Sequence, residues 1–457
     1  MKQLHIAPDG VFDAERFAAG LAREHAADYV EAINQLSPEQ AAQVVVKLPT
    51  DAAIDILDMP ELFFGAEIVM ALPRPLAVTL LTGMSADMAA DIAHYLPEDV
   101  RADLLRGMDS ATRDNITKLL SYPENSAGGI MTTEFVSVPS TFTVEQTLQH
   151  IRRVERTRET VYAIYVLDPE THRLVTAISL RQQIAGEPTA NILSVARQRE
   201  TITTRPLVDR EEVARLISKY NLLAIPVVDK AGHVIGIVTV DDIIDTIIEE
   251  NTEDVQKFGG MEATDEPYMQ IGMLGMLRKR GGWLAVLFLG ELLTASAMQH
   301  YEVALEKALV LTLFIPLIMS SGGNSGSQAT SLLIRALALR EVKLGDWWRV
   351  ALREAPTGLI LGAMLGLIGF ARVVVWQKIG IYDYGEHWML VALTVAAALV
   401  GVVTFGSLAG SMLPFILQRV GFDPASASAP FVATLVDVAG LVIYFSVALL
   451  ILSGTLL

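Results

Sequence analysis

The sequence predicts a multidomain membrane protein with four successive parts. An all-α N-terminal superhelical domain is expected over residues 1–127, an α/β tandem repeat over 128–240, an amphipathic connecting helix over 241–271 and a five-helix α transmembrane domain over 272–457. Three observations predict this order. A polar, charged first part gives way to a much more apolar remainder, short apolar stripes recur between helix breakers at the start, and a strand and helix pattern occurs twice in the middle.

The acidity of the chain belongs to the part before the membrane domain. The whole chain has 35 Lys and Arg against 52 Asp and Glu, and residues 1–271 carry 23 and 42 of these, a net charge of −19. Such a surface repels nucleic acid and attracts cations, although an acidic face that only aids solubility is an alternative. The chain has no cysteine, hence no disulfide framework and no thiolate for a soft metal.

The sequence shows no features of a signal peptide at its start and no motif of an ATP-hydrolysing enzyme. Its opening residues, MKQLHIAPDG, lack an apolar core, so the large polar part is expected to stay in the cytosol. The stretch from Asp229 to Gly232 resembles the phosphorylated turn of P-type pumps, but a strand on each side favours a hairpin turn. No Walker A sequence occurs, so we expect a protein that is not an enzyme.

The N-terminal domain is expected to be a superhelix of short helices. Breakers or N-caps followed by acids and an apolar stripe recur at intervals of roughly 10 to 14 residues. Ser85 is a candidate N-cap, and Asp87 and Asp91 stand four residues apart on one helical face, where like charges repel. Acids that answer the helix dipole are the alternative, which suits Asp87 better than Asp91.

A tandem repeat of about 65 residues follows. In the first copy, strands are expected at 131–138, 161–168 and 174–180 around a helix at 143–153. The second copy repeats this order, with strands at 201–204, 224–229 and 233–242 and a helix at 211–220.

This pattern resembles a pair of CBS domains, most specifically in PVVDKAGHVIGIVTVDD. The resemblance implies that Thr239 and Asp242 could hold the ribose of an adenine nucleotide such as ATP. In the first copy, Ser179 is followed by Gln182, where an acid is usual.

The helix after the repeat is amphipathic. Its apolar stripe consists of isoleucines, and an acidic flank runs beside it, so it is either a simple linker or a lever that rests on a pore. Five membrane spans follow, at about 282–299, 305–339 (with a broken or bent portion), 349–375, 387–417 and 425–455.

Basic residues predict the orientation of these spans. With the N-terminus in the cytosol, the outer flanks carry only Lys307, Arg372 and Lys378, and the C-terminus is extracytoplasmic. The cytosolic flanks then carry nine basic residues: Arg278, Lys279, Arg280, Arg335, Arg340, Lys343, Arg349, Arg353 and Arg419.

Asp437 is the chief candidate for function, because it lies in the middle of the last span. An Asp at a helix centre costs about 2.5 to 3.5 kcal/mol on insertion scales, so it normally faces an ion path, a water-filled cavity or a partner charge. No basic residue lies at mid-span in another segment, which favours an ion path over an ion pair. Glu291 in the first span is a second intramembrane acid.

The second span contains FIPLIMSSGGNSGSQ, where Pro316 and three glycines allow close helix approach or an unwound backbone. Asn324 and Gln328 offer carbonyl oxygens one turn apart, and a packing seam of small residues is the alternative. The last span is expected to begin with Asp423 as N-cap and Pro424 as its first helical residue.

These membrane sequences resemble the signatures of the MgtE magnesium channels and transporters, as does the domain order. The resemblance implies a homodimer with one pore, in which Asp437 selects the ion with the carbonyl of Ala433 and the amide of Asn324. It also implies regulatory Mg²⁺ ligands in the cytosolic parts and at the membrane face: Asp87, Asp91, Asp209, Glu211, Asp242, Asp245, Glu250, Glu253, Asp254 and Asp423. Asn221 stands where the family often has Asp.

The resulting hypothesis is a Mg²⁺-selective channel of the inner or plasma membrane that cytosolic Mg²⁺ closes. A proton- or sodium-coupled divalent-cation transporter with Glu291 as the coupling acid is one alternative. A membrane-tethered sensor that does not conduct is another. Mg²⁺ is a hard ion that prefers oxygen ligands, but Co²⁺, Mn²⁺ and Ca²⁺ also accept them, so the sequence leaves selectivity open.

Overall fold

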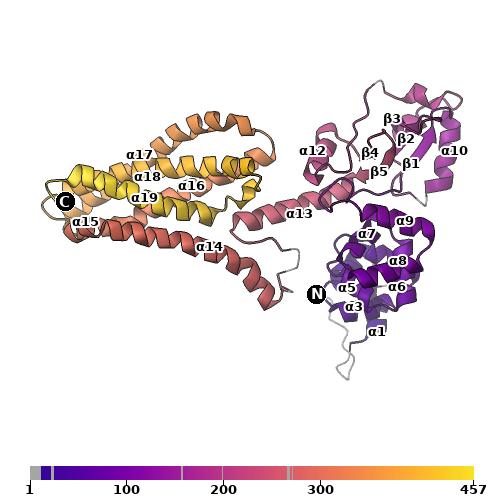
Figure 1. Ribbon diagram of the computed structural model, residues 1–457, viewed down its shortest axis with the longest axis horizontal. Helices are drawn as coiled ribbons and strands as arrows, with labels where there is room; N and C mark the ends of the chain where they lie inside the picture. Colours follow the sequence, from indigo (N-terminus) through magenta and orange to yellow (C-terminus); the bar gives the residue numbers. More distant parts are fainter. Residues whose placement is uncertain are drawn as a thin grey trace. The chain divides into compact units, whose positions relative to one another are not determined.

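The computed structural model describes residues 12–21, 25–155, 158–197, 199–264, 268–269 and 271–456. It divides the chain into two compact units, residues 1–250 and 251–457, which are described separately below. Figure 1 colours both along the sequence.

The N-terminal part of the first unit is a superhelix of short helices, as predicted. Each helix packs against the next but one along the chain, from α1 with α3 through to α7 with α9. Prolines 49, 73 and 97 occupy N-cap positions and so separate successive helices. The helices are α1 (Ala14–Leu21), α2 (Ala26–Ile33), α3 (Pro38–Val45), α4 (Thr50–Leu57), α5 (Gly65–Ala71), α6 (Arg74–Gly83), α7 (Ala86–Tyr95), α8 (Glu98–Gly107) and α9 (Ser110–Leu119).

The tandem repeat forms two small sheets. In the first copy, β1 (Val136–Pro139) pairs in parallel with β2 (Ala163–Leu167), which pairs antiparallel with β3 (Leu174–Ser179). The copy also contains α10 (Val144–Val154), α11 (Leu180–Ile184) and the 3₁₀ helix η2 (Ile192–Val195).

In the second copy, β4 (Ala224–Val228) and β5 (Val234–Thr239) form an antiparallel hairpin after α12 (Arg210–Tyr220). Asp229 accepts hydrogen bonds from the backbone amides of Ala231 and His233, which confirms the predicted turn.

Two details of the repeat differ from the prediction or explain it. The expected strand at 201–204 is only an isolated parallel bridge between Thr204 and Val227, because β4 is paired mainly with β5. Asn221 adopts the left-handed conformation at the C-cap of α12, with φ of 50°. Asn tolerates this conformation better than most residues, which gives a structural reason for its presence.

The connecting helix α13 (Val240–Phe258) starts directly after β5 and crosses from the first unit into the second. Its predicted apolar stripe is partly exposed, since Ile243 is buried whereas Ile244 and Ile247 are not. The chain then leaves helical structure before the first membrane helix begins at Met273.

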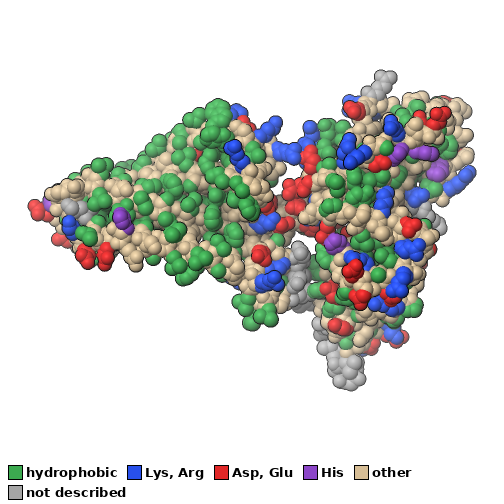
Figure 2. Space-filling model, viewed as in Figure 1, with side chains coloured by type: hydrophobic (Ala, Val, Ile, Leu, Met, Phe, Trp, Pro, Cys, Tyr) green, Lys and Arg blue, Asp and Glu red, His purple; other side chains and the backbone are tan. Residues whose placement is uncertain are grey.

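Five helices among the described residues are long and apolar enough to cross a membrane. Hydrophobic side chains cover the visible outside of this unit (Figure 2). The helices are α14 (Met273–His300), α16 (Ile315–Ala338), α17 (Trp347–Ile379), α18 (Trp388–Val420) and α19 (Ala429–Leu452). The second span is broken as expected: α15 (Glu302–Lys307) and the 3₁₀ helix η3 (Leu309–Phe314) precede α16, while η4 (Leu344–Asp346) precedes α17.

Glycines bring α16 and α18 into backbone contact. A Cβ added at Gly410 would lie 2.1 Å from the carbonyl oxygen of Gly326, and one at Gly406 would lie 2.3 Å from that of Gly322. Thr330 donates a hydrogen bond to the Gly410 carbonyl at 2.7 Å. The glycines of the second span therefore form a packing seam, and α16 is continuous rather than unwound.

The start of the last span differs from the prediction. Asp423 accepts a hydrogen bond from the Ala425 amide at 2.8 Å, but it caps only the short 3₁₀ helix η5 (Pro424–Ser426). The membrane helix α19 begins at Ala429, where the Ser428 hydroxyl accepts from the Phe431 amide. The two caps lie too close in sequence for one helix to use both.

Candidate cation-binding sites

Asp437 lies on α19 one helical turn after Ala433, and its side chain is partly exposed in the single chain. Gly323 of α16 faces Ala433, because a Cβ added at Gly323 would lie 3.5 Å from both the Cα and the Cβ of Ala433. Asn324 is the next residue on α16 and is exposed. The close approach of the two helices therefore places the Asn324 backbone beside the turn of α19 that leads to Asp437.

A polar stripe continues this region along α16. Ser320, Asn324 and Gln328 follow each other at intervals of four residues, and all three are exposed. The side-chain amide nitrogen of Asn324 lies 3.5 Å from the Ser320 hydroxyl. Polar groups at such depth normally face a water-filled path or another protein surface rather than lipid. The stripe and Asp437 are thus suited to line an ion path.

The polar neighbour of Asp437 is Glu291 of α14. Helices α14 and α19 contact each other, and the two carboxyl groups lie close enough for their charges to interact. Among the described residues, no basic side chain forms an ion pair with Asp437. The alternative of an Arg or Lys partner for Asp437 is therefore not observed among these residues. Sequence reasoning singled out both acids but did not pair them.

A second group of carboxylates lies within the first unit, around α7. Asp87 is buried, with only 7% of its surface exposed, and its Oδ1 atom has no hydrogen-bond partner among the described residues. Burial and the nearby carboxylate of Glu159 raise the pKa of Asp87 to about 7. One turn on, Asp91 is exposed. Partial loss of hydration together with the charges of Glu124, Glu249 and Asp242 raises its pKa to about 7, while the charge of Arg210 opposes this rise.

Two further members come from other parts of the unit. Burial, followed by the charge of Asp87, raises the pKa of Asp242 at the start of α13 to about 7. Glu159, in the loop after α10, is exposed, and partial loss of hydration together with the charges of Asp242 and Asp241 raises its pKa to about 7. We call Asp87, Asp91, Glu159 and Asp242 the α7 carboxylate cluster. Carboxylates whose charges repel one another are stabilised either by protons or by a cation.

Asp58 borders this cluster and fixes the start of α7. Its Oδ1 accepts hydrogen bonds from the Ser85 hydroxyl at 2.7 Å and from the Ser85 amide at 3.0 Å. Ser85 is therefore at the predicted N-cap position, but its hydroxyl serves Asp58 rather than the helix. Burial raises the pKa of Asp58 despite these bonds.

Basic side chains form ion pairs with several of the other predicted ligands. Arg210 of α12 pairs with Glu249 at 2.9 Å and with Glu250 at 2.7 Å. Lys257 pairs with both Glu253 and Asp423, the latter at 2.6 Å.

The remaining predicted ligands lie on α12 and α13. Asp209 is exposed and caps α12 by accepting from the Glu211 amide at 2.9 Å, and Glu211 is exposed in the first turn. Burial, followed by the charges of Glu61 and Glu249, raises the pKa of Asp245. Asp254 is half-buried on α13.

Thr239 and Asp242, the predicted nucleotide-binding pair, bind each other. The Asp242 carboxylate accepts from the Thr239 amide at 2.9 Å and from its hydroxyl at 2.5 Å. Ser179 and Gln182 form the corresponding capping box in the first copy. Both pairs thus cap helices, and only the second offers a carboxylate.

Among the described residues, no three His, Asp or Glu side chains converge closely enough to hold one bare metal ion. The carboxylates fit a cation differently. Asp87 has a buried oxygen without a hydrogen-bond partner among the described residues, and the negative charges of Glu159 and Asp242 act on it or on each other. That chemistry suits a hydrated Mg²⁺, which keeps several of its waters.

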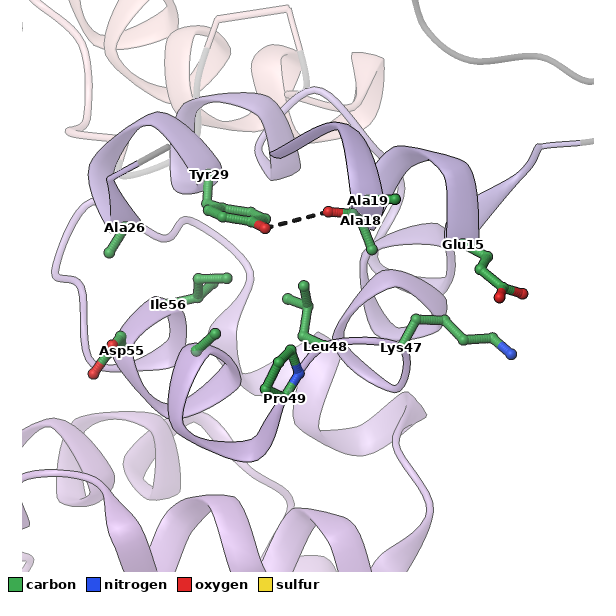
Figure 3. A pocket seen from close by; sticks show the side chains of 11 residues that line it. Glu15, Ala18, Ala19, Ala26, Tyr29, Lys47, Leu48, Pro49, Asp55 and Ile56 are labelled. Atoms are coloured by element: carbon green, nitrogen blue, oxygen red, sulfur yellow. Dashed lines mark hydrogen bonds between the residues drawn. The ribbon is translucent and has the colours of Figure 1, made fainter. Parts of the chain in front are cut away.

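One surface pocket is unrelated to these groups. It has a volume of about 320 Å³ and lies among α1, α2 and α4, where Tyr29 donates a hydrogen bond to the Ala18 carbonyl (Figure 3). None of the predicted site residues lines it.

Several charged neighbours were not predicted from the sequence. Glu159 belongs to the α7 carboxylate cluster and Asp58 borders it. Arg210 pairs with Glu249 and Glu250 in the same unit, and Lys257 pairs with Glu253 and Asp423 in the membrane unit. No periodic pattern marks these residues, since each is an ordinary polar residue in its own element. Only their long-range contacts identify them.

Apolar spans that carry an acid and a polar stripe, joined to acidic cytosolic-type domains, define a membrane transport protein for cations. Comparison with known families agrees. A model described as a divalent cation transporter matches residues 315–447, the MgtE intracellular N domain matches 24–125, and a CBS domain matches 198–249.

Similar proteins include the magnesium transporter MgtE of Thermus thermophilus, 40% identical over 76% of this chain and 74% of that protein. The magnesium transporter MgtE of Enterococcus faecalis is 37% identical over 73% and 70%. A crystal structure of the cytosolic domain of the Mg²⁺ channel MgtE in complex with ATP is 34% identical, covers 51% of this chain and 95% of that one, and has a TM-score of 0.47.

The chain belongs to the MgtE family of magnesium transporters. This confirms the predicted family and the multidomain membrane fold, and it places the protein in a transport family rather than an enzyme family.

Proposed function

We propose that this protein is a Mg²⁺-selective channel that admits Mg²⁺ down its electrochemical gradient and closes when cytosolic Mg²⁺ is abundant. The observation that carries the proposal is the Asp437 carboxylate, which is partly exposed on a predominantly apolar helix that packs against α16, where Asn324 is exposed. A group of this kind has no stable place against lipid, but it attracts a hydrated divalent cation.

A homodimer follows from the same surface. The polar stripe of α16 and the acid of α19 are exposed in one chain, and a two-fold axis would bring two copies together around one pore. Two carboxylates, helped by the carbonyl of Ala433 and the amide of Asn324, can hold Mg²⁺ through its water shell. Such binding is strong enough for entry and weak enough for release. The predicted orientation places the N-terminus in the cytosol.

Closure is assigned to the α7 carboxylate cluster. Its four acids repel one another when ionised, and Mg²⁺ bound among them favours the arrangement that keeps α7 close to the start of α13. Scarce Mg²⁺ removes this advantage and shifts the population toward an open arrangement. The other predicted ligands, including Asp209, Glu211, Asp245 and Asp254, extend the same acidic surface.

The test is Mg²⁺ flux into liposomes that contain the purified protein, at low and at high Mg²⁺ on the cytosolic side. Asp437→Ala should abolish flux, whereas Glu306→Ala, which removes an exposed acid from α15, should leave it intact. Flux that persists in Asp437→Ala would refute the pore assignment. Flux that needs Asp437 but ignores cytosolic Mg²⁺ would refute only the gating assignment.

A coupled transporter is the second candidate, because Glu291 of α14 is a second intramembrane acid beside Asp437. In that case Glu291→Gln should abolish uptake that an imposed proton or sodium gradient drives. A channel should still conduct in this variant when only the Mg²⁺ gradient is present. A sensor that does not conduct would give no Asp437-dependent flux in either assay.

Nucleotide binding at Thr239 and Asp242 stays a prediction. Asp242 belongs both to this pair and to the α7 carboxylate cluster, so ATP and Mg²⁺ would act on the same carboxylate. Calorimetric titration with ATP, for the wild type and for Thr239→Ala, tests it: heat that is lost in the variant supports binding at this position. Equal heats would place any ATP elsewhere.

A further inference from the structure

Lys257 occupies the space between two acids that were predicted as regulatory Mg²⁺ ligands. Its Nζ lies 2.6 Å from Oδ2 of Asp423, at the connection between α18 and α19, and it also pairs with Glu253 one turn earlier on α13. The three side chains are 26%, 37% and 34% exposed, so water screens the contacts only in part.

The segment around Lys257 is tied to the membrane helices by further contacts. The Gln256 side chain accepts from the Thr264 amide at 2.7 Å, and Lys279 of α14 donates to the Ala263 carbonyl at 2.6 Å. The Glu262 amide in turn donates to the Lys279 carbonyl at 3.1 Å. The end of α13 is thereby joined to the start of α14 through hydrogen bonds that need no ion.

Gly260 permits the closest approach in this region. Its φ of +76° is the left-handed conformation that glycine adopts readily, and an added Cβ would lie 2.7 Å from Nε1 of Trp283. Trp283 donates to the Ser428 hydroxyl, at the N-cap of α19, at 3.3 Å. We call the contacts of residues 256–264 with α14 and with the α18–α19 connection the α13 anchor.

We propose that Lys257 is a built-in cation that holds the α13 anchor together without a metal ion. The inference rests on the proposed function, which makes Glu253 and Asp423 candidate Mg²⁺ ligands. An ammonium already in direct contact with both carboxylates leaves them a net charge of about −1 rather than −2, which weakens their attraction for a divalent ion. Mg²⁺ would also have to displace Lys257 and give up water, which it does reluctantly.

The consequence is a division of labour between the two ends of α13. The start of the helix carries Asp242, whose acidic neighbours make it responsive to cations, whereas the end is fixed by Lys257 under all conditions. Movement that Mg²⁺ controls therefore pivots about a permanent contact at the membrane unit.

Hydrogen–deuterium exchange of the full-length protein in nanodiscs tests this proposal. The amides from Gly259 to Thr264 report directly on the anchor, because several of them are hydrogen-bonded within it. In the wild type their protection should be the same with millimolar Mg²⁺ and with a chelator. In Lys257→Met they should exchange about tenfold faster without Mg²⁺, as expected for loss of a charge-assisted hydrogen bond.

Millimolar Mg²⁺ should restore protection in Lys257→Met, since the exposed pair of carboxylates can then bind the ion. Lys257→Arg keeps the charge and should stay protected, and Lys230→Met, which removes an exposed lysine from the β4–β5 turn, is the matched control. If Lys257→Met does not fold, Asp423→Asn provides the second test: it should exchange faster without rescue by Mg²⁺.

Two results would overturn the proposal. One is a wild-type anchor that loses protection when Mg²⁺ is removed, which would make the contact metal-dependent. The other is full protection of both Lys257→Met and Asp423→Asn in the chelator. Neither readout involves flux, so the anchor can fail while the Asp437 pore survives, and the reverse also holds.

Discussion

Replacing Asp87 by Asn is expected to stabilise α7 in Mg²⁺-free buffer at pH 8, although it removes a native charge. Asp87 is buried, its Oδ1 has no partner among the described residues, and its charge faces that of Glu159. An amide of the same shape keeps the packing and removes both the desolvation of a carboxylate and its repulsion by the neighbours.

The magnitude follows from the pKa of Asp87, which burial raises from 3.8 to about 7. Because the folded-state pKa lies above the unfolded one, the charge destabilises the fold as pH rises between these values, and the effect is complete above pH 7. At 1.36 kcal/mol per pKa unit it amounts to about 4 kcal/mol at pH 8 and about 2 kcal/mol at pH 5. The advantage of Asp87→Asn should therefore shrink as the pH is lowered.

Exchange protection of the α7 amides, corrected for intrinsic rates, measures this effect in the full-length protein. All five Trp residues lie beyond residue 280, so Trp fluorescence would not report on α7. Millimolar Mg²⁺ at pH 8 should protect wild-type α7, whereas Asp87→Asn should respond less because one ligand is gone.

Asp99→Asn, an exposed acid on α8, is the control for loss of charge and should change little. Reduced protection of Asp87→Asn at pH 8, or a gain equal to that of Asp99→Asn, would refute the assignment of Asp87 as an electrostatically strained carboxylate.

Three further predictions concern contacts that hold each unit together. Gly410→Ala should lower the free energy of unfolding by about 1 to 3 kcal/mol, because the added Cβ would lie 2.1 Å from the Gly326 carbonyl oxygen. Thermal melting in detergent measures this effect. Gly345→Ala is the control and should melt like the wild type, because an added Cβ there has no atom within 4 Å. Tyr444→Phe removes the 2.8 Å hydrogen bond to the buried Leu311 carbonyl and should cost about 1 to 2 kcal/mol in the same assay, whereas Tyr382→Phe, on an exposed ring, should be neutral. Arg210→Met leaves Glu249 and Glu250 without their shared cation, so amide exchange in α12 should rise more in the absence of Mg²⁺ than in its presence. Equal exchange in both conditions, or the same change in the exposed control Arg205→Met, would argue against a local electrostatic role.

The elements of this fold were readable wherever a local rule applied. Breakers at 49, 73 and 97 separate the short helices because proline at an N-cap both ends one helix and starts the next. The five spans could be predicted because each is long and apolar enough to cross a bilayer. The predicted start of the last span was wrong because two residues that can act as N-caps, Asp423 and Ser428, lie close together, and only packing selects between them.

The glycines of the second span illustrate a different limit. Their sequence allowed either an unwound backbone or a close helix contact, and both use the missing side chain. The structure selects the contact because α18 carries its own glycines at matching heights, with Gly406 opposite Gly322 and Gly410 opposite Gly326. The outcome depends on the complementarity of two segments that are distant in sequence, and the sequence of one segment alone does not reveal it.

The acids show why a list of carboxylates does not by itself define a set of metal sites. A carboxylate can be balanced by a metal ion, by a proton or by a basic side chain, and the sequence of one segment does not reveal which. Residues of similar local pattern differ in this respect. Asp87 has an oxygen without a hydrogen-bond partner among the described residues, which suits a cation, Asp437 lies beside a second acid, Glu291, and Asp423 is bound by Lys257. We therefore propose that regulation of this transporter by Mg²⁺ depends on the acids that lack a basic partner, a group from which Lys257 removes Asp423.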